Sequence, residues 1–302
     1  MTSSVRDYYD YPSAAKIGAQ GAGLIWFLGG RDHLSPSYNN HDEIALDSRM
    51  WRAGASRRCL RLVHEMAIAP GALVLDFGSG IGGPGRDIHA TTGARVVGIN
   101  LSRQQLKTSL ALSLLQRPAE PLFADLVNAD GQSLPFCAQS FEHVYSINMF
   151  YHIPAPEQAL SEIARVLRPG GRFGLDDWFL TERTSTATRQ NLRTNWSSPQ
   201  GFHRLSDVRL WLEQRGLLIV KELDFTDAAG QFLSEERFGA VFDRQVRARL
   251  IEVFPQLYQY EGYIPEHAAL AAEQLRSDIL YMGQLYRSGE AVYTQLIAEK
   301  RS

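Results

Sequence analysis

The sequence predicts an α/β fold in which a mostly parallel sheet carries helices on both faces. Three observations predict it: short apolar runs alternate with amphipathic segments, a glycine-rich turn follows the first run, and a proline stands where the next helix begins. Short apolar runs are typical of strands buried on both faces, and their alternation with helices is typical of parallel sheets. With 302 residues, 44% of them hydrophobic, the chain can form a sizeable core.

The expected elements follow one another in a regular order. Strands are predicted at 73–77, 95–99, 126–129, 143–147 and 172–176, and helices at 84–90, 103–116 and 156–167. Pro169-Gly170-Gly171 is expected to form the turn before the fifth strand. A sixth unit consists of a helix at 205–215, a stop at Gly216 and a strand at 217–224, and a last strand is expected at 291–298.

Two segments lie outside this alternation. Tyr8, Tyr9 and Tyr11 are closely spaced near the start of the chain, and 42–69 has apolar residues at helical spacing. A second helical stretch separates the sixth strand from the last. We therefore expect four parts, which are an N-terminal helical segment, a core, a helical insertion, and a final core strand with its tail, at 1–69, 70–227, 228–286 and 287–302.

The glycine-rich turn predicts a nucleotide-type site. Glycines let a ligand lie against the backbone, and a helix start offers free N–H groups. Gly78, Gly80 and Gly83 also fit the spacing of a dinucleotide site, but a carboxylate at Asp76 would repel a pyrophosphate and suits a cationic ligand. S-adenosylmethionine, with its ammonium and sulfonium groups, fits better. A turn without a ligand and an NAD-dependent dehydrogenase are the alternatives.

The run from this turn onward resembles a known family. Gly78-Ser79-Gly80-Ile81-Gly82-Gly83-Pro84, Arg86 and Thr92-Gly93-Ala94-Arg95-Val96-Val97-Gly98-Ile99-Asn100 resemble the class I S-adenosylmethionine-dependent methyltransferases, in particular their sterol C-methyltransferase-like branch. The resemblance covers about Leu73 to Glu182, and it departs from the branch at Ser79, where cysteine is usual. It implies a Rossmann-like sheet of seven strands, the seventh antiparallel between the fifth and sixth, with an N-terminal helical lid and a helical cap.

The resemblance also implies a cofactor and the residues that bind it. The cofactor is S-adenosyl-L-methionine, which leaves as S-adenosyl-L-homocysteine. Ligands of such sheets lie at the carboxyl ends of the strands, so each strand end supplies candidates. Asp130 is expected to bind the adenine amino group, and the alternative is an ordinary loop or helix-capping acid. The predicted cofactor-binding residues are Asp76, Gly78, Ser79, Gly80 and Gly82 at the methionine part, Asn100, Leu101 and Gln105 at the ribose, Asp130, Gly131 and Gln132 at the adenine, and Asn148.

Three residues are predicted to be catalytic. His152 follows the fourth strand, which the family places beside the transferable methyl group, and a histidine with a pKa near ~6.5 can accept a proton. Asp176 and Asp177 end the fifth strand, and we expect at least one of them, taken as Asp177, to face the substrate. Tyr9 belongs to the implied lid. The alternatives are an ordinary loop histidine, a capping acid, and tyrosines that only pack onto the core.

The expected activity is methyl transfer to an alkene carbon of an isoprenoid or prenylated small molecule of secondary metabolism. The resulting cation loses a proton or cyclises, and aromatic residues in the flanking segments stabilise it. N- or O-methylation of an amine, sugar or phenol is the alternative. The flanking segments hold few basic residues, which disfavours a diphosphate-bearing substrate.

Charge and cysteine content limit the classes of partner expected for this protein. A net charge of −2 gives no reason to expect a nucleic acid or an anionic membrane. Cys59 and Cys137 form neither a metal spacing nor a disulfide framework, so no metal is expected. No signal peptide or membrane span is visible, and we expect a cytoplasmic enzyme with a small-molecule substrate, a homo-oligomer being left open.

Overall fold

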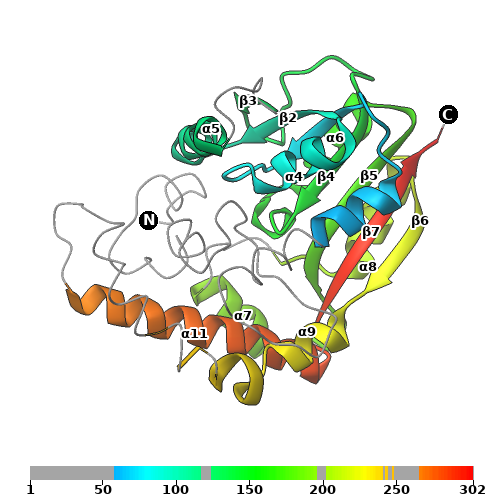
Figure 1. Cartoon of the computed structure of the whole chain (residues 1–302). Helices are drawn as coiled ribbons and strands as arrows, with labels where there is room; N and C mark the ends of the chain where they lie inside the picture. Colours follow the sequence, from blue (N-terminus) through cyan, green and yellow to red (C-terminus); the bar gives the residue numbers. More distant parts are fainter. Residues whose placement is uncertain are drawn as a thin grey trace.

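A sheet of seven strands forms the centre of the molecule (Figure 1). The structure is a computed structural model, and it describes residues 58–116, 124–195, 202–240, 242–243, 247 and 265–301. The strands stand in the order β3-β2-β1-β4-β5-β7-β6. Their bounds are β1 Leu73–Phe77, β2 Arg95–Asn100, β3 Ala124–Asn128, β4 Phe141–Ile147, β5 Leu167–Leu180, β6 Leu217–Asp224 and β7 Ala291–Lys300.

Strand direction confirms the expected topology. The first five strands run parallel, and β7 lies antiparallel between β5 and β6. Parallel strands need long crossovers, and these supply most of the helices. Their bounds are α4 Gly83–Thr92, α5 Arg103–Gln116, α6 Pro156–Val166, α7 Thr186–Asn195, α8 Leu205–Gln214, α9 Thr226–Phe232, α11 Pro265–Ser288, a 3₁₀ turn η3 at Phe150–His152 and a π-helical turn η4 at Glu235–Gly239.

The two faces of the sheet carry separate apolar cores. Alternate residues of a strand point to opposite faces, so Leu75 and Phe77 of β1 contribute to one core, and Val74 to the other. Helices α6 and α8 cover the first core. Helical residues 58–66 and α4 cover the second.

Several boundaries differ from the expectation. β5 begins at Leu167, because Pro169-Gly170-Gly171 bulges out of the ladder within it instead of ending one element and starting the next. Phe141 of β4 pairs with Leu167, but His143, two residues on, pairs with Arg172. Gly170 takes a φ of 73°, which favours glycine. Neither η3 nor α7 was expected.

Helices α9 and α11 lie between β6 and β7 in the chain and pack on each other (Figure 1). Gly283 permits this approach, since a Cβ there would overlap the backbone of Leu233. Arg287 donates to the carbonyls of Gly230 at 2.5 Å and Leu233 at 2.9 Å. None of the helices described is long and apolar enough to cross a membrane.

Candidate active site

The glycine-rich turn leaves β1 in a conformation that few other residues adopt. Gly78, Gly80 and Gly82 have φ values of 88°, 53° and 80°, and Gly82 caps the start of α4. The N–H groups of Gly78 and Ser79 donate to the carbonyl of Ile99, at 3.1 and 2.8 Å. The turn is thereby fastened to β2, and the first turn of α4 lies at the carboxyl end of β1.

Ser79 and Gly78 each mark a close approach at this turn. A Cβ on Gly78 would overlap the side chain of Met149, whose Cε would lie 2.6 Å away. The Oγ of Ser79 is buried and has no hydrogen-bond partner in the described part of the chain. A buried hydroxyl without a partner costs free energy. A ligand that forms a hydrogen bond with Ser79 Oγ would remove this cost.

Asp76 is buried below the turn. Its side chain lies on the sheet face covered by residues 58–66, near Tyr145 and Arg86. Burial raises the pKa of Asp76 to about 7, and the Tyr145 hydroxyl and the Arg86 charge oppose that rise. At neutral pH the carboxyl is poised between its two forms. An approaching cation would therefore favour the ionised form.

Arg86 belongs to the motif that carries the resemblance, but no site role was predicted for it. Its Nη2 donates to the carbonyl of Ile81 at 2.8 Å, inside the glycine turn. Its Nη1 donates to Ser113 Oγ at 3.3 Å and to the Ser109 carbonyl at 3.4 Å, both on α5. Arg86, which lies in α4, thus ties the turn to α5, and its place in the resembling motif was the available sequence signal.

The predicted ribose residues lie together beside the turn. The Nδ2 of Asn100 donates to Gln105 Oε1 at 2.7 Å and to the Gly80 carbonyl at 3.3 Å. Ser102 caps α5, with its Oγ accepting from the Gln105 N–H at 3.1 Å. Asn128 donates to the carbonyl of Leu101 at 3.0 Å. An amide pair held in this way offers oxygen and nitrogen atoms that suit hydroxyl groups.

The predicted adenine loop begins with a turn built by Asp130. Its Oδ1 accepts from the backbone N–H of Gln132 at 2.9 Å and from the Gln132 side chain at 3.1 Å. A Cβ on Gly131 would overlap the ring of Phe77 at the end of β1. The loop is therefore held against the core, while Asp130 itself is exposed.

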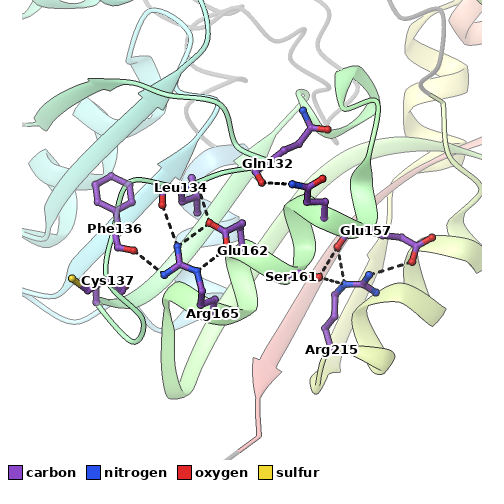
Figure 2. Close-up of polar contacts among 11 residues, drawn as sticks. Gln132, Leu134, Phe136, Cys137, Glu157, Ser161, Glu162, Arg165 and Arg215 are labelled. Atoms are coloured by element: carbon purple, nitrogen blue, oxygen red, sulfur yellow. Dashed lines mark hydrogen bonds and ion pairs between the residues drawn. The ribbon is translucent and has the colours of Figure 1, made fainter.

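Helix α6 fixes the rest of this loop (Figure 2). Glu162 accepts from the Leu134 N–H at 2.7 Å. Arg165 donates to the carbonyls of Leu134 and Phe136, at 3.1 and 2.8 Å, and pairs with Glu162. Gln158 donates to the Gln132 carbonyl at 2.9 Å. The loop is preformed by side chains of one helix, which the sequence did not indicate.

Asn148 ends β4 in a strained conformation. Its φ is 48°, which costs free energy for a residue other than glycine. Its N–H donates to the carbonyl of Asp176 at 2.8 Å. Its Oδ1 is buried and has no hydrogen-bond partner within the described ranges. Strain and an unsatisfied oxygen in one residue are typical of a functional site.

His152 and Asp177 lie close to this strand end. Burial lowers the pKa of His152 to about 3, so the imidazole is neutral at physiological pH. Asp177 is fully buried and accepts from the N–H groups of Phe150 at 2.7 Å and Trp178 at 2.9 Å. Burial raises the pKa of Asp177 to about 7, against these two hydrogen bonds. Asp177 thus holds η3, the turn that carries His152.

Asp176 points to the opposite face and binds side chains from two distant segments, the helical residues 58–66 and β7. It pairs with Arg58 at 3.2 Å, accepts from Gln295 Nε2 at 2.5 Å, and also accepts from the hydroxyl of Tyr293. The Arg58 guanidinium lies 5.2 Å from the centre of the Tyr293 ring. This carboxylate is therefore satisfied by protein groups.

Four rings form what we call the aromatic cluster: Tyr151, His152, Trp178 and Phe202. Tyr151 and Phe202 stack in parallel with 5.3 Å between ring centres, and Trp178 lies 4.5 Å from Phe202 and 5.3 Å from Tyr151. His152 lies 4.0 Å from Tyr151. The cluster begins where η3 follows β4. Tyr9, the third predicted catalytic residue, lies outside the described residues.

Comparisons with known proteins agree with this arrangement. Residues 75–175 match a family described as "Methyltransferase domain". A sterol 24-C-methyltransferase of Gibberella zeae is 40% identical over 121 residues, which are 40% of this chain and 31% of that protein. The chain thus spans about a third of the length of this curated relative.

Two solved structures share the fold. A phosphoethanolamine N-methyltransferase 2 of Haemonchus contortus, in complex with S-adenosyl-L-methionine, has a TM-score of 0.74 at 18% identity over 99% of this chain and 60% of its own. A geranyl diphosphate C-methyltransferase of Streptomyces coelicolor has a TM-score of 0.67 at 15% identity, over 98% and 96%. Residues 75–175 thus match a methyltransferase domain and are similar to part of the sterol 24-C-methyltransferases.

Proposed function

We propose that the chain transfers a methyl group from S-adenosylmethionine to an alkene carbon of an isoprenoid or prenylated small molecule. The observation that carries this proposal is the 40% identity to a sterol 24-C-methyltransferase. The aromatic cluster supports the same class of acceptor, because aromatic faces stabilise a carbocation. The same signature motivates a place in secondary metabolism, in the cytoplasm.

The described residues fit the cofactor. The turn has no Cβ at Gly78, Gly80 and Gly82, and buried oxygens of Ser79 and Asn148 have no hydrogen-bond partner in the described part of the chain. Asp76 would complement the cationic methionine end, the Asn100–Gln105 pair the ribose, and Asp130 the adenine amino group. When bound, the cofactor supplies an electrophilic methyl group.

The aromatic cluster and His152 would act on the acceptor. Most of the rate would come from holding the alkene in line and excluding water. The ring faces of Tyr151, Trp178 and Phe202 then stabilise the cation formed on the acceptor. His152 is neutral and takes a proton from a carbon next to the cationic centre, unless ring closure consumes the charge first. A carbocation is so strong an acid that a base with a pKa near 3 suffices.

Asp177 would position this machinery. Its hydrogen bond to the Phe150 N–H fixes the start of η3, and hence the distance between His152 and the acceptor. Tyr9 remains a candidate from the N-terminal segment, which we propose closes over the acceptor as a lid, with 228–286 as a cap. Methylation of an amine, sugar or phenol is the competing function, and there His152 would accept the acceptor's own N–H or O–H proton.

One experiment tests the assignment. The protein is incubated with methyl-labelled S-adenosylmethionine and a panel of isoprenoid, amine and phenol acceptors, and the products are identified by mass spectrometry. We expect label on carbon of an isoprenoid. Label on nitrogen or oxygen alone would replace this proposal with the competing one. Affinity for NAD without affinity for S-adenosylmethionine would exclude both.

A further inference from the structure

Three arginines gather after β5, and we call them the arginine trio: Arg189 and Arg193 on α7, and Arg204 directly before α8. Burial and then the charges of Arg204 and Arg193 lower the pKa of Arg189, against the attraction of Asp207 and Glu182. The three positive charges are therefore close enough to repel one another. A fold keeps such an arrangement when something else compensates it.

The nearby acids Asp207 and Glu182 oppose this repulsion, but neither forms an ion pair with the trio within the described residues. Arg189 Nη2 and Arg204 Nε are buried there without a hydrogen-bond partner, and none of the three forms an ion pair within those ranges. Glu182, which lies near enough to feel Arg204, instead accepts from the Ser206 hydroxyl at 2.6 Å. Buried guanidinium nitrogens without acceptors are costly.

Arginines elsewhere in the molecule show the contrast. Arg165 pairs with Glu162 at 2.7 Å, Arg276 with Glu235 at 2.7 Å, and Arg215 with Glu157 at 3.2 Å. Each of these guanidinium groups has a carboxylate partner close by. The trio differs from them in pairing, which points to an acceptor supplied from outside the protein.

The trio also adjoins the aromatic cluster. Arg204 pairs with Leu180 at the end of β5, and Phe202 of the cluster lies two residues before it. Leu192, on the same helix as Arg189, belongs to one apolar core with Trp178 and Phe202. An acceptor whose apolar body lies on the cluster would thus bring one end to the trio.

We infer that Arg189 and Arg204 bind a phosphate or diphosphate group at the end of the methyl acceptor. Guanidinium groups bind phosphate oxygens through two parallel N–H bonds, and a third positive charge nearby favours a polyanion over a single carboxylate. This inference rests on the proposed function and names the acceptor more closely. It also revises the expectation that the substrate carries no diphosphate. That expectation considered basic residues of the flanking segments alone, whereas the trio lies in the core part, 70–227.

The test compares binding to the protein saturated with S-adenosyl-L-homocysteine, by calorimetry. The ligands are a C10 prenyl diphosphate, its alcohol and inorganic pyrophosphate, and the proteins are wild type, Arg189→Gln, Arg204→Gln and Arg95→Gln. Arg95 is the control, since its exposed side chain is on β2, on the other side of the sheet. We expect each trio substitution to weaken diphosphate and pyrophosphate binding at least about tenfold, and Arg95→Gln to leave it unchanged.

Three results would overturn the inference. They are equal binding of alcohol and diphosphate by the wild type, unchanged diphosphate affinity in both trio variants, or an equal loss in Arg95→Gln. Unchanged affinity for S-adenosyl-L-homocysteine shows that a variant is folded. Because pyrophosphate binding needs no methyl transfer, failure to methylate any acceptor would count against the proposed function and leave this binding test intact.

Discussion

The two halves of the proposed site are built by different means. The cofactor half consists of the glycine turn, the Asn100–Gln105 pair and the Asp130 loop. Its contacts come mostly from backbone groups and polar side chains. The acceptor half consists of η3, the aromatic cluster and the arginine trio, and it depends on large side chains from β5, α7 and the stretch before α8. The cofactor half depends on a particular backbone conformation, and the acceptor half depends on contacts between particular side chains.

This difference predicts how each half responds to substitution. The cofactor half should be sensitive to added atoms, because a single Cβ collides with its neighbours. The acceptor half should be sensitive to lost atoms, because its rings and charges are what we propose that a substrate contacts. Each of the following experiments tests one side of that contrast.

The largest effect is expected from Gly78→Ala. The added Cβ combines a positive φ with a collision against Met149, and we expect the free energy of unfolding to fall by about 2 to 5 kcal/mol, with loss of cofactor binding. Gly71→Ala is the control, since its φ is +77° but nothing lies within 4 Å. Denaturant titration and cofactor calorimetry measure both. Equal effects of the two substitutions would show strain alone, and adding Met149→Ala should restore part of the loss.

Asp76→Asn should change how stability depends on pH. The folded pKa of about 7 lies above the unfolded value, so the contribution of Asp76 to stability is complete below pH ~4 and is lost as the pH rises through 7. The unfolding free energy of the variant, relative to wild type, should therefore rise by about 2 to 4 kcal/mol between pH 4 and pH 8. Asp125→Asn, at an exposed carboxylate on β3, should show no such rise. A flat difference for Asp76→Asn would mean that this carboxyl titrates normally.

His152→Ala should lower kcat on the order of 100-fold, while the Kd for the cofactor changes less than about twofold. A proton acceptor acts on the substrate and leaves adenosine binding alone. Because burial lowers the pKa of His152 to about 3, kcat of the wild type should show no ionisation of this residue near pH 6.5. His143→Ala is the control, because His143 lies within β4 and outside the turn η3 that carries His152. A parallel loss of affinity and kcat would move His152 into the cofactor half.

Asn148 separates backbone strain from side-chain chemistry. Asn148→Gly keeps the positive φ without strain and removes Oδ1, whereas Asn148→Ala removes Oδ1 and keeps the strain. We expect kcat/KM to fall about tenfold in both, and stability to fall only in the alanine variant, by about 1 kcal/mol. Full activity in the glycine variant would assign Asn148 a backbone role only.

The smallest effect is expected from Asp130→Ala. It removes the hydrogen bond that we propose Asp130 accepts from the adenine, so cofactor affinity should fall by on the order of 1 kcal/mol in calorimetry. Asp125→Ala, at the exposed carboxylate of the neighbouring strand, provides the control. An unchanged affinity in the folded variant would make Asp130 an ordinary loop acid, whose side chain bonds Gln132.

Elements that depend on local sequence could be predicted, and those that depend on distant contacts could not. Strands 73–77 and 217–224 and helix 103–116 were predicted with the observed bounds, because each is a continuous apolar or amphipathic run. Helix α7 was not, because Leu192 and Thr188 are the buried residues of an otherwise polar segment. The turn η3 depends on Asp177, 27 residues farther along the chain from Phe150.

Site residues follow the same rule. Asn100 and Gln105 are five residues apart, so a local motif predicts their contact. The partners of Asp176 come from residue 58 and from β7, and no local pattern connects them. The arginine trio joins a helix that was not expected to a strand end, so its charges could not be placed together from spacing alone.

The partners of Asp176 also set an order of events during synthesis. Tyr293 and Gln295 follow it by 117 and 119 residues, which a ribosome adds in roughly 6 to 24 s at ~5–20 residues per second. Throughout that interval β5 has no neighbour on the side that β7 will occupy. The nascent chain therefore presents an open strand edge and a half-satisfied buried acid, while the segment from β1 to β4 has already left the ribosome. This edge is where a chaperone would have most to protect.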